Sequence, residues 1–404
     1  MQKKRILFVG EGVTLAHIVR PLVLAKALDK EIYDVFFACD ARFKKMVDNE
    51  GFNWQEISTM PSEEFLKKLS TGDPLYTYER LKSNVADDLD LLSRIRPDLV
   101  IGDFRISLDI SAPTLNIPYV CLVNVYWSPY STLILPIPEL PKVNIVYLTI
   151  AKLVFKLFSS VFLASHMQGF NRLRSEYRLP PINNIKKMYT DGTWTLYLDL
   201  PSLVPVYSLP ANHQYLGPVC EMLSLPKPEW WGKWPNHKPI IYLSFGSSGD
   251  ITLLDLFKSI LKEMDVTVIL TTSGRVKEED FPENFYVTQY VDGLEVARIA
   301  QLFISNGGSG AIYQALTHGV PVLGLPSNMD QFFLMERIEK LGAGILIRPS
   351  QATKSIIVSS IEHILLEKRF KDVAGGIGAH IRKFDTKAHF KDFVAGVLKN
   401  KRNV

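Results

Sequence analysis

A histidine and an aspartate stand where they could act together as a catalytic base. His17 follows the apolar run Arg5–Val9 and a short glycine-containing loop, and Asp103 directly follows the apolar run Leu99–Gly102. Parallel strands end at the same edge of a sheet, so both side chains can reach one site there. A histidine takes up protons near neutral pH, and a neighbouring aspartate can hold it in the productive tautomer. The pattern predicts a base, His17, supported by Asp103.

Both residues also have structural interpretations. His17 could cap or pack its helix, and Asp103 could cap a helix that begins near Ile106. The loop Gly10–Gly12 has the GxG of a dinucleotide-binding turn, but Leu15 stands where the third glycine of GxGxxG would be. The sequence therefore disfavours a dinucleotide-dependent dehydrogenase.

The segment NGGSGAIYQALTHGVPVLGLPSNMDQ, residues 306–331, has the pattern of an anion-binding loop. Small residues follow an expected strand, Leu302–Ser305, and a helix is expected to begin near Ser309. Glycines let the backbone approach a ligand closely, and the N–H groups of a helix N-terminus attract phosphate. An ordinary strand-to-helix turn is the alternative, but the length of the pattern favours a diphosphate site.

This segment resembles the donor-binding signature of the UDP-glycosyltransferase superfamily, which includes plant secondary-metabolite and bacterial macrolide and natural-product glycosyltransferases. The signature positions hold Asn306, Gly308, Ala311, Gln314, Gly319-Val320-Pro321 and Asp330-Gln331, in register without a gap. AHIVRPLVLAKAL, from Ala16, resembles the helix that carries the family's catalytic histidine, and Ser244–Ser247 and Gly217-Pro218 resemble two further motifs. The resemblance spans both halves of the chain and is most specific in the C-terminal half.

The resemblance implies a set of site residues. The catalytic pair is His17 and Asp103. The donor-binding residues are Gly246, Ser247, Tyr290, Val291, Asn306, Gly308, Ser309, Gly310, Gln314, Asp330 and Gln331. Tyr290 falls where the family has the aromatic residue that stacks on the base. The helix N-terminus at Ser309 should hold the diphosphate, and Asp330 and Gln331 should hold the sugar hydroxyls.

Several of these positions depart from the family pattern. Asn306 replaces a histidine, Ala311 a hydroxyl residue, Gln314 a ribose-binding glutamate, and Asp292-Gly293 a Pro-Gln pair. Asparagine can donate a hydrogen bond to phosphate but carries no charge, and a glutamine accepts more weakly than a carboxylate. We expect the side chain of Gln314 to be partly exposed. The sugar and the nucleotide, UDP or dTDP, stay open.

Strands alternate with helices on both sides of a proline-rich break. The expected strands are 5–9, 33–38, 99–102, 119–123, 240–245, 266–271, 285–290, 302–305 and 321–325, and the expected helices are 17–28, 76–95, 253–264 and several within 352–398. This alternation predicts parallel sheets built from βαβ units. The expected fold is α/β, with two doubly wound Rossmann-like domains that face each other across a cleft, as in the GT-B architecture that the resemblance implies.

The break sets the expected domain limits. Residues 1–218 should form an acceptor-binding domain, 219–237 a linker, and 238–384 a nucleotide-sugar-binding domain. By the resemblance, a final helix in 385–404 should return to the N-terminal domain.

Composition excludes several classes of protein. The chain has 404 residues, 22% charged, and a net charge of +4, with no basic run that would indicate nucleic-acid binding. Its cysteines are Cys39, Cys121 and Cys220, without a CxxC pair, so neither a zinc site nor a disulfide framework is predicted. We expect a metal-independent, cytoplasmic protein.

One apolar segment, Val143–Ala164, is long enough to span a membrane, but Lys152 and Lys156 lie near its middle. We interpret it as a buried helix; a wall of the acceptor site and a peripheral membrane contact are the alternatives. Tyr126 and Trp127, which follow an expected strand, should line the acceptor site.

Together these patterns predict an inverting glycosyltransferase. It would move a sugar from a nucleotide-diphosphate sugar to a hydroxyl of a hydrophobic acceptor, either a natural product or a lipid-like alcohol, and would need no cofactor. The alternatives are a non-catalytic nucleotide-sugar-binding auxiliary protein and a nucleotide-sugar epimerase of the same fold. The sequence leaves the oligomeric state open.

Overall fold

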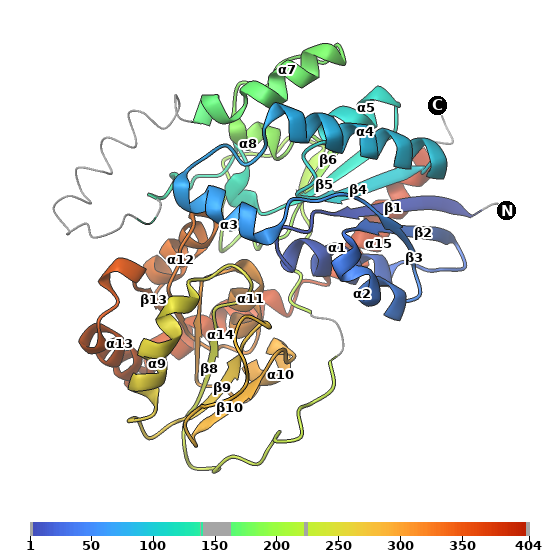
Figure 1. Cartoon of the computed structure of the whole chain (residues 1–404). Helices are drawn as coiled ribbons and strands as arrows, with labels where there is room; N and C mark the ends of the chain where they lie inside the picture. The colour runs from blue at the N-terminus through green and yellow to red at the C-terminus, as the bar shows by residue number, and fades with distance from the viewer. Residues whose placement is uncertain (1–2, 138, 140–162, 222–224, 401–404) are drawn as a thin grey trace. The chain divides into compact units, whose positions relative to one another are not determined.

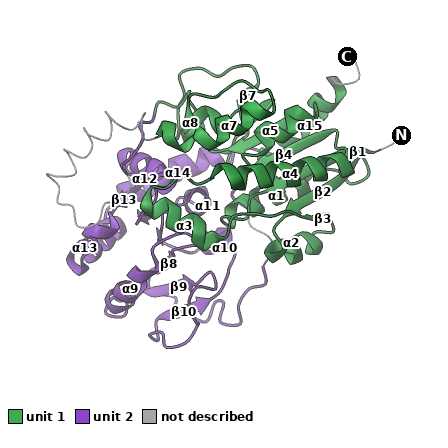
Figure 2. Cartoon of the chain, turned by 45° about the horizontal axis from the view of Figure 1, so that its top comes forward, with its two compact units in different colours: residues 1–132, 155–219, 385–404 green, residues 133–154, 220–384 purple. Residues whose placement is uncertain are grey.

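The computed structural model describes residues 3–137, 139, 163–221 and 225–400. They form two compact units (Figure 2). Unit 1 comprises residues 1–132, 155–219 and 385–404, and unit 2 comprises 133–154 and 220–384. The segment Val143–Ala164 lies outside the described residues except for its last two. Within the described ranges, no helix combines the length and the apolar character that crossing a membrane requires.

Unit 1 is built on a parallel sheet of seven strands in the order β3-β2-β1-β4-β5-β6-β7 (Figure 1). The strands are β1 (Lys4–Gly10), β2 (Tyr33–Cys39), β3 (Asn53–Glu56), β4 (Leu99–Asp103), β5 (Tyr119–Val123), β6 (Trp194–Tyr197) and β7 (His213–Tyr215). The helices are α1 (Ala16–Ala27), α2 (Lys44–Asn49), α3 (Ser62–Thr71), α4 (Tyr78–Ile95), α5 (Leu108–Thr114), α7 (Gln168–Glu176), α8 (Ile185–Met188) and α15 (Thr386–Asn400).

Strands β4 and β5, near the centre of the sheet, are buried along their whole length because helices cover both faces of the sheet. The last helix, α15, packs against α1, and the ring of its buried Phe390 lies 6.0 Å from that of Phe8 in β1. The C-terminal residues of the chain therefore complete the core of unit 1.

Unit 2 is built on a second parallel sheet, of six strands in the order β10-β9-β8-β11-β12-β13. The strands are β8 (Ile240–Ser244), β9 (Thr267–Thr271), β10 (Phe285–Thr288), β11 (Leu302–Ser305), β12 (Val322–Gly324) and β13 (Gly344–Leu346). The helices are α9 (Leu254–Leu261), α10 (Gly293–Ala297), α11 (Ser309–Thr317), α12 (Met329–Leu341), α13 (Lys354–Leu366) and α14 (Lys368–Ile381).

The prediction of two doubly wound α/β domains is confirmed by these sheets. The expected strands are all present, but four further strands, β3, β6, β7 and β13, were missed. They are only three or four residues long, and β3 and β7 lack a run of buried positions, so their apolar pattern is too weak to recognise.

The compact units divide the chain at other places than the expected domain limits. Of the expected linker, Val219 belongs to unit 1, and residues 220–221 and 225–237 belong to unit 2. Residues 133–137 and 139, which the sequence put in the N-terminal domain, belong to unit 2. The reason is local: Arg348 donates to the carboxylate of Glu139 and to the carbonyl of Ile137, each at 3.3 Å, and Ser350 N–H donates to Glu139 at 2.9 Å.

Candidate active site

The structure places His17 beside Asp103 in unit 1. Strands β1 and β4 pair in parallel with Gly10 opposite Asp103, and His17 is the second residue of α1. Nδ1 of His17 lies 2.7 Å from Oδ1 of Asp103. Asp103 is fully buried, whereas the His17 side chain is 18% exposed. The carboxylate does not cap a helix, because the residue at the N-terminal end of α5 is Ser107.

Arg20, which the sequence analysis did not single out, is the second partner of this carboxylate. Its Nε and Nη2 donate to Oδ2 and Oδ1 of Asp103 at 2.9 and 2.6 Å, and its Nη1 donates to Oδ1 of Asn124 at 2.7 Å. Arg20 lies one turn after His17 on α1 and is buried. A single arginine in the otherwise apolar stretch IVRPLVLA was the signal that could have revealed it, since a buried arginine needs an acidic partner.

The charge of Arg20 determines how Asp103 titrates. Burial would raise the pKa of Asp103, but the Arg20 charge and His17, together with their hydrogen bonds, lower that pKa below the usual value for an aspartate. The carboxylate therefore stays ionised and can accept hydrogen bonds from two donors at once.

The same geometry assigns the tautomer of His17. Nδ1 lies 2.7 Å from Asp103 and 3.0 Å from Nη2 of Arg20, which can only donate. The shorter contact, to an ionised acceptor, places the proton on Nδ1 and leaves the lone pair on Nε2. Among the described residues no hydrogen bond reaches Nε2, so this atom can take a proton from an incoming group.

Aromatic rings surround the imidazole. The Phe104 ring stacks on His17 with centroids 4.7 Å apart and planes 14° apart, and on Tyr189 at 5.7 Å and 13°. Trp127 lies 5.3 Å from Tyr189 and is partly exposed, but Tyr126 is fully buried and offers no surface to a ligand in this structure. Of the two residues predicted from the sequence to line the acceptor site, only Trp127 thus has surface that a ligand could contact in this structure.

A mainly apolar pocket lies next to these rings. Its lining comes from the loop before α4 and α4 itself, from the loop between β4 and α5, from α7 and the residues before it, and from α8 and the residue after it. The lining residues are Leu75, Tyr76, Leu81, Ile106, His166, Phe170, Ile185, Met188 and Tyr189. Tyr76 and Tyr189 belong both to this pocket and to the rings around Phe104. Sequence reasoning missed the pocket because its residues come from four separate segments.

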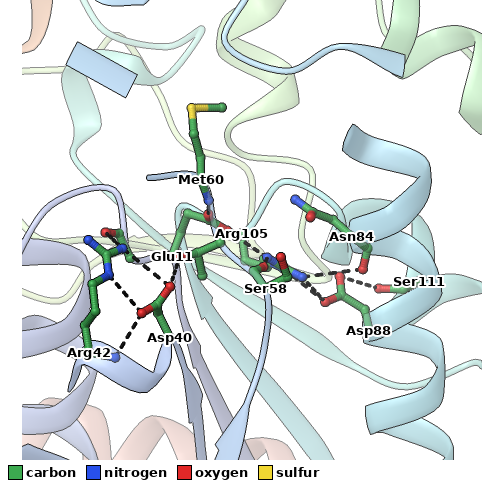
Figure 3. A network of polar contacts seen from close by, with 11 residues as sticks. Glu11, Asp40, Arg42, Ser58, Met60, Asn84, Asp88, Arg105 and Ser111 are labelled. Carbon is green, nitrogen blue, oxygen red and sulfur yellow. Dashed lines mark hydrogen bonds and ion pairs between the residues drawn. The ribbon is translucent and has the colours of Figure 1, made fainter. Parts of the chain in front are cut away.

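A buried ionic network holds the loops that carry the pair (Figure 3). Arg105, two residues after Asp103, lies 2.9 Å from Glu11 in the loop after β1 and 2.9 Å from Asp88 on α4. It also donates to the carbonyl of Ser58 at 2.7 Å. Arg105, Glu11 and Asp88 are at most 1% exposed, so the network links the ends of β1, β3 and β4 inside the protein.

In unit 2, the expected diphosphate loop leads into α11 at Ser309. Gly308 precedes the helix without a side-chain cap, and a Cβ at Gly310 would meet no atom within 4 Å, so the first turn faces open space. Asn306 is buried, and its amide accepts from Gly308 N–H and donates to Ser248 Oγ, both at 3.3 Å. The N–H groups of this turn can bind an anion.

The other residues predicted to bind the donor differ in exposure and in their contacts. Gly246 has a positive φ of 56°, and Ser247, Tyr290 and Asp330 are partly exposed. Val291 and Gln331 are buried, and Gln331 donates to Ser248 at 3.1 Å and accepts from Ser327 N–H at 2.8 Å. Through these contacts, Gln331 links the segments that contain Ser248 and Ser327.

The expected exposure of Gln314 was wrong. Its side chain is 7% exposed, its amide nitrogen donates to the carbonyl of Cys220 at 3.2 Å, and a Cβ at Gly293 would come within 2.1 Å of its Oε1. The side chain fills the space that Gly293 leaves. Among the described residues, no three His, Cys, Asp or Glu side chains form a group that could hold a metal ion.

Three mycobacterial proteins are similar to this chain over most of its length. It is 40% identical to a "PGL/p-HBAD biosynthesis glycosyltransferase" of Mycobacterium tuberculosis, over 92% of this chain and 87% of the relative. A "PGL/p-HBAD biosynthesis rhamnosyltransferase" of Mycobacterium bovis is 39% identical over 92% and 83%. An "inactive PGL/p-HBAD biosynthesis glycosyltransferase" of Mycobacterium bovis is 41% identical over 64% and 71%.

Family and fold comparisons agree with these relatives. Residues 256–381 match the family "Erythromycin biosynthesis protein CIII-like, C-terminal domain". The structure resembles the glycotransferase of kitacinnamycin, with a TM-score of 0.72 at 18% identity, covering 98% of this chain and 100% of that one. It also resembles the glycosyltransferase VinC in complex with dTDP, with a TM-score of 0.68 at 18% identity, covering 98% and 100%. The chain therefore belongs to the UDP-glycosyltransferase superfamily, and it is a glycosyltransferase with the GT-B fold.

Proposed function

We propose that this glycosyltransferase moves a sugar, with inversion, from a nucleoside-diphosphate sugar to a hydroxyl group of a hydrophobic acceptor. The observation that carries the proposal is the His17–Asp103 hydrogen bond, which leaves Nε2 of His17 without a hydrogen bond from the described residues. An imidazole in this state is a suitable general base near neutral pH.

In the proposed step, Nε2 of His17 takes the proton of the acceptor hydroxyl. The hydroxyl oxygen forms a bond to the anomeric carbon, and the bond from that carbon to the diphosphate oxygen breaks. Asp103 stabilises the imidazolium, as a buried carboxylate does in other acid–base pairs. The developing charge on the diphosphate is stabilised by the N–H groups at the start of α11, near Ser309 and Asn306.

The acceptor class follows from the surroundings of His17 in unit 1. The pocket next to the rings around Phe104 is lined mainly by apolar and aromatic side chains, among them Tyr76, Phe170 and Met188. Burial of apolar acceptor surface there would provide most of the affinity. An aromatic natural product or a lipid-like alcohol fits these walls.

For the donor, the relation to VinC, whose structure contains dTDP, supports a nucleoside diphosphate, and both dTDP and UDP stay open as its nucleotide. We assign the phosphates to the α11 N-terminus, the base to Tyr290 and the sugar to Asp330 and Gln331. Asn306 supplies an amide where a charged group would bind more strongly.

The test is a transfer assay with the purified full-length chain. UDP- and dTDP-sugars are combined with phenols and long-chain alcohols, and the anomeric configuration of each product is read by NMR. We expect an inverted glycoside, and His17→Ala should lower turnover about a hundredfold or more while UDP and dTDP still bind. Full turnover in this variant, or retention of configuration, would refute the proposed mechanism.

A further inference from the structure

The backbone of Phe104 is unusual. Its φ is 61°, in the left-handed region that bulky residues rarely occupy. Such a conformation persists only when the surrounding structure imposes it, and it occurs preferentially at functional sites. Phe104 is therefore a residue whose conformation needs an explanation.

Its two neighbours supply the constraint. Asp103 is held by His17 and Arg20. Arg105 is held by Glu11 and by the carbonyl of Ser58 (Figure 3). Both neighbours are buried and bonded in fixed directions. The chain must link them through Phe104, and in the left-handed conformation the Phe104 ring lies on the imidazole of His17.

The result is that one short segment holds His17 in two ways. Asp103 binds Nδ1 at the edge of the imidazole, at 2.7 Å, and Phe104 covers its face, with ring planes 14° apart. The hydrogen bond fixes which edge of the imidazole faces the carboxylate, but the ring can still turn about the line of that bond. The stacked ring removes this freedom.

The stack also bears on the charge of the imidazole. Arg20 Nη2 lies 3.0 Å from Nδ1 and can donate to this nitrogen when it carries no proton, so Arg20 competes with Asp103 for the same atom. An aromatic face attracts a cation, so the Phe104 ring would stabilise the imidazolium that forms when His17 takes up a proton. Phe104 is itself held by Tyr189, which stacks on it at 5.7 Å, and by Phe65, which meets it edge-on at 5.9 Å.

From this geometry we propose that Phe104 is a positioning residue that keeps Nε2 of His17 directed at the acceptor hydroxyl. The inference rests on the proposed function, in which His17 is the base. It predicts that the flat ring at position 104, rather than its apolar volume, is what turnover requires.

Two variants separate these properties. Phe104→Leu keeps apolar volume but has no ring face, and Phe104→Tyr keeps the ring. We expect Phe104→Leu to lower kcat roughly ten- to a hundredfold with little change in the KM for the donor, and Phe104→Tyr to retain most of the wild-type kcat. Melting curves and calorimetry with UDP and dTDP establish that both variants fold and bind nucleotide. Equal activities in the two variants would overturn the proposal.

A double-variant cycle tests whether Phe104 acts through His17. If it does, Phe104→Leu lowers the activity of the wild type but not the residual activity of His17→Ala, because the residue it positions is already absent. Equal fold-losses in both backgrounds would show that Phe104 contacts the acceptor or serves folding instead, and would overturn the proposal. Full turnover of His17→Ala alone would refute the proposed function. Nitrogen-15 NMR of labelled histidine would then show whether Phe104 positions His17.

Nitrogen-15 NMR of labelled histidine reads the state of His17 without any turnover. We expect the wild type and Phe104→Tyr to show the proton on Nδ1, and Phe104→Leu to show a mixture of the two tautomers, since Arg20 can then compete for Nδ1. A Phe104→Leu spectrum identical to that of the wild type would show that the ring does not position His17.

Discussion

Nδ1 of His17 and Oδ1 of Asp103 lie 2.7 Å apart, although 86 residues separate them along the chain. The contact exists because β1 and β4 are neighbours in the sheet and end side by side. Asp103 accepts hydrogen bonds from both His17 and the guanidinium of Arg20, so removal of the carboxylate would affect the proposed base and the packing of two basic side chains.

The first prediction concerns stability in acid. The pKa of Asp103 in the folded protein is below that of an aspartate in an unfolded chain, about 3.9. Its contribution to stability is therefore fully present above roughly pH 4 and is lost as the pH falls through the lower, folded value. Urea unfolding between pH 2 and 5 should show Asp103→Asn to be less stable than the wild type, by a difference that is largest at the upper end of this range and shrinks below about pH 4. A difference that grows in acid would contradict the shift.

A second prediction concerns the buried network. Arg105→Met should destabilise unit 1 by about 3–5 kcal/mol, because Glu11 and Asp88 would lose a buried partner. The matched control is Lys354→Met, which removes an exposed ion pair with Glu263 and should leave the midpoint of urea unfolding unchanged. Equal effects of the two substitutions would mean that the buried network does not hold unit 1 together.

The third prediction replaces the expectation that Gln314 binds ribose at an exposed site. Gln314→Glu should lower the melting temperature, since a buried carboxylate would face the carbonyl of Cys220 in place of an N–H donor. Gln289→Glu, on the exposed surface of the same unit, serves as the control and should have no such effect. Tighter UDP binding by Gln314→Glu, with an unchanged melting temperature, would restore the original interpretation.

A fourth prediction is that excess EDTA leaves turnover unchanged. The proposed diphosphate site uses the N–H groups at the start of α11, which need no bound cation to attract phosphate. The measurement is turnover with and without EDTA, followed by addition of magnesium or manganese. Activity that disappears with EDTA and returns with either ion would show that a metal takes part.

The sequence was sufficient to locate the His17–Asp103 pair because the position of a strand end follows from a short apolar run. The rule that parallel strands end at one edge then brings the two residues together. The start of α11 could be predicted equally well from the sequence, since glycines and a helical pattern follow β11 directly. Both predictions needed only local patterns and one rule of topology.

The partners of these residues could not be predicted in the same way. Arg20, Phe104 and Arg105 owe their roles to side-chain directions and to a left-handed backbone, which depend on packing between distant segments. Gln314 illustrates the same limit, because its burial depends on the absence of a side chain at Gly293 on α10. The alignment of a sequence motif predicts on which element a residue lies, but it does not predict whether its side chain is exposed.

The place of α15 has a consequence for how the protein is made. Unit 1 begins with the first strand of the chain, yet Phe390 of α15 fills its core beside Phe8. Domains fold as units while synthesis proceeds from the N-terminus. The core of unit 1 is not closed until α15 (Thr386–Asn400) has been synthesised, whereas residues 220–384 of unit 2 form one continuous segment that precedes it. The unit whose first strands are synthesised first is thus the unit whose core is completed later, after α15 has been synthesised.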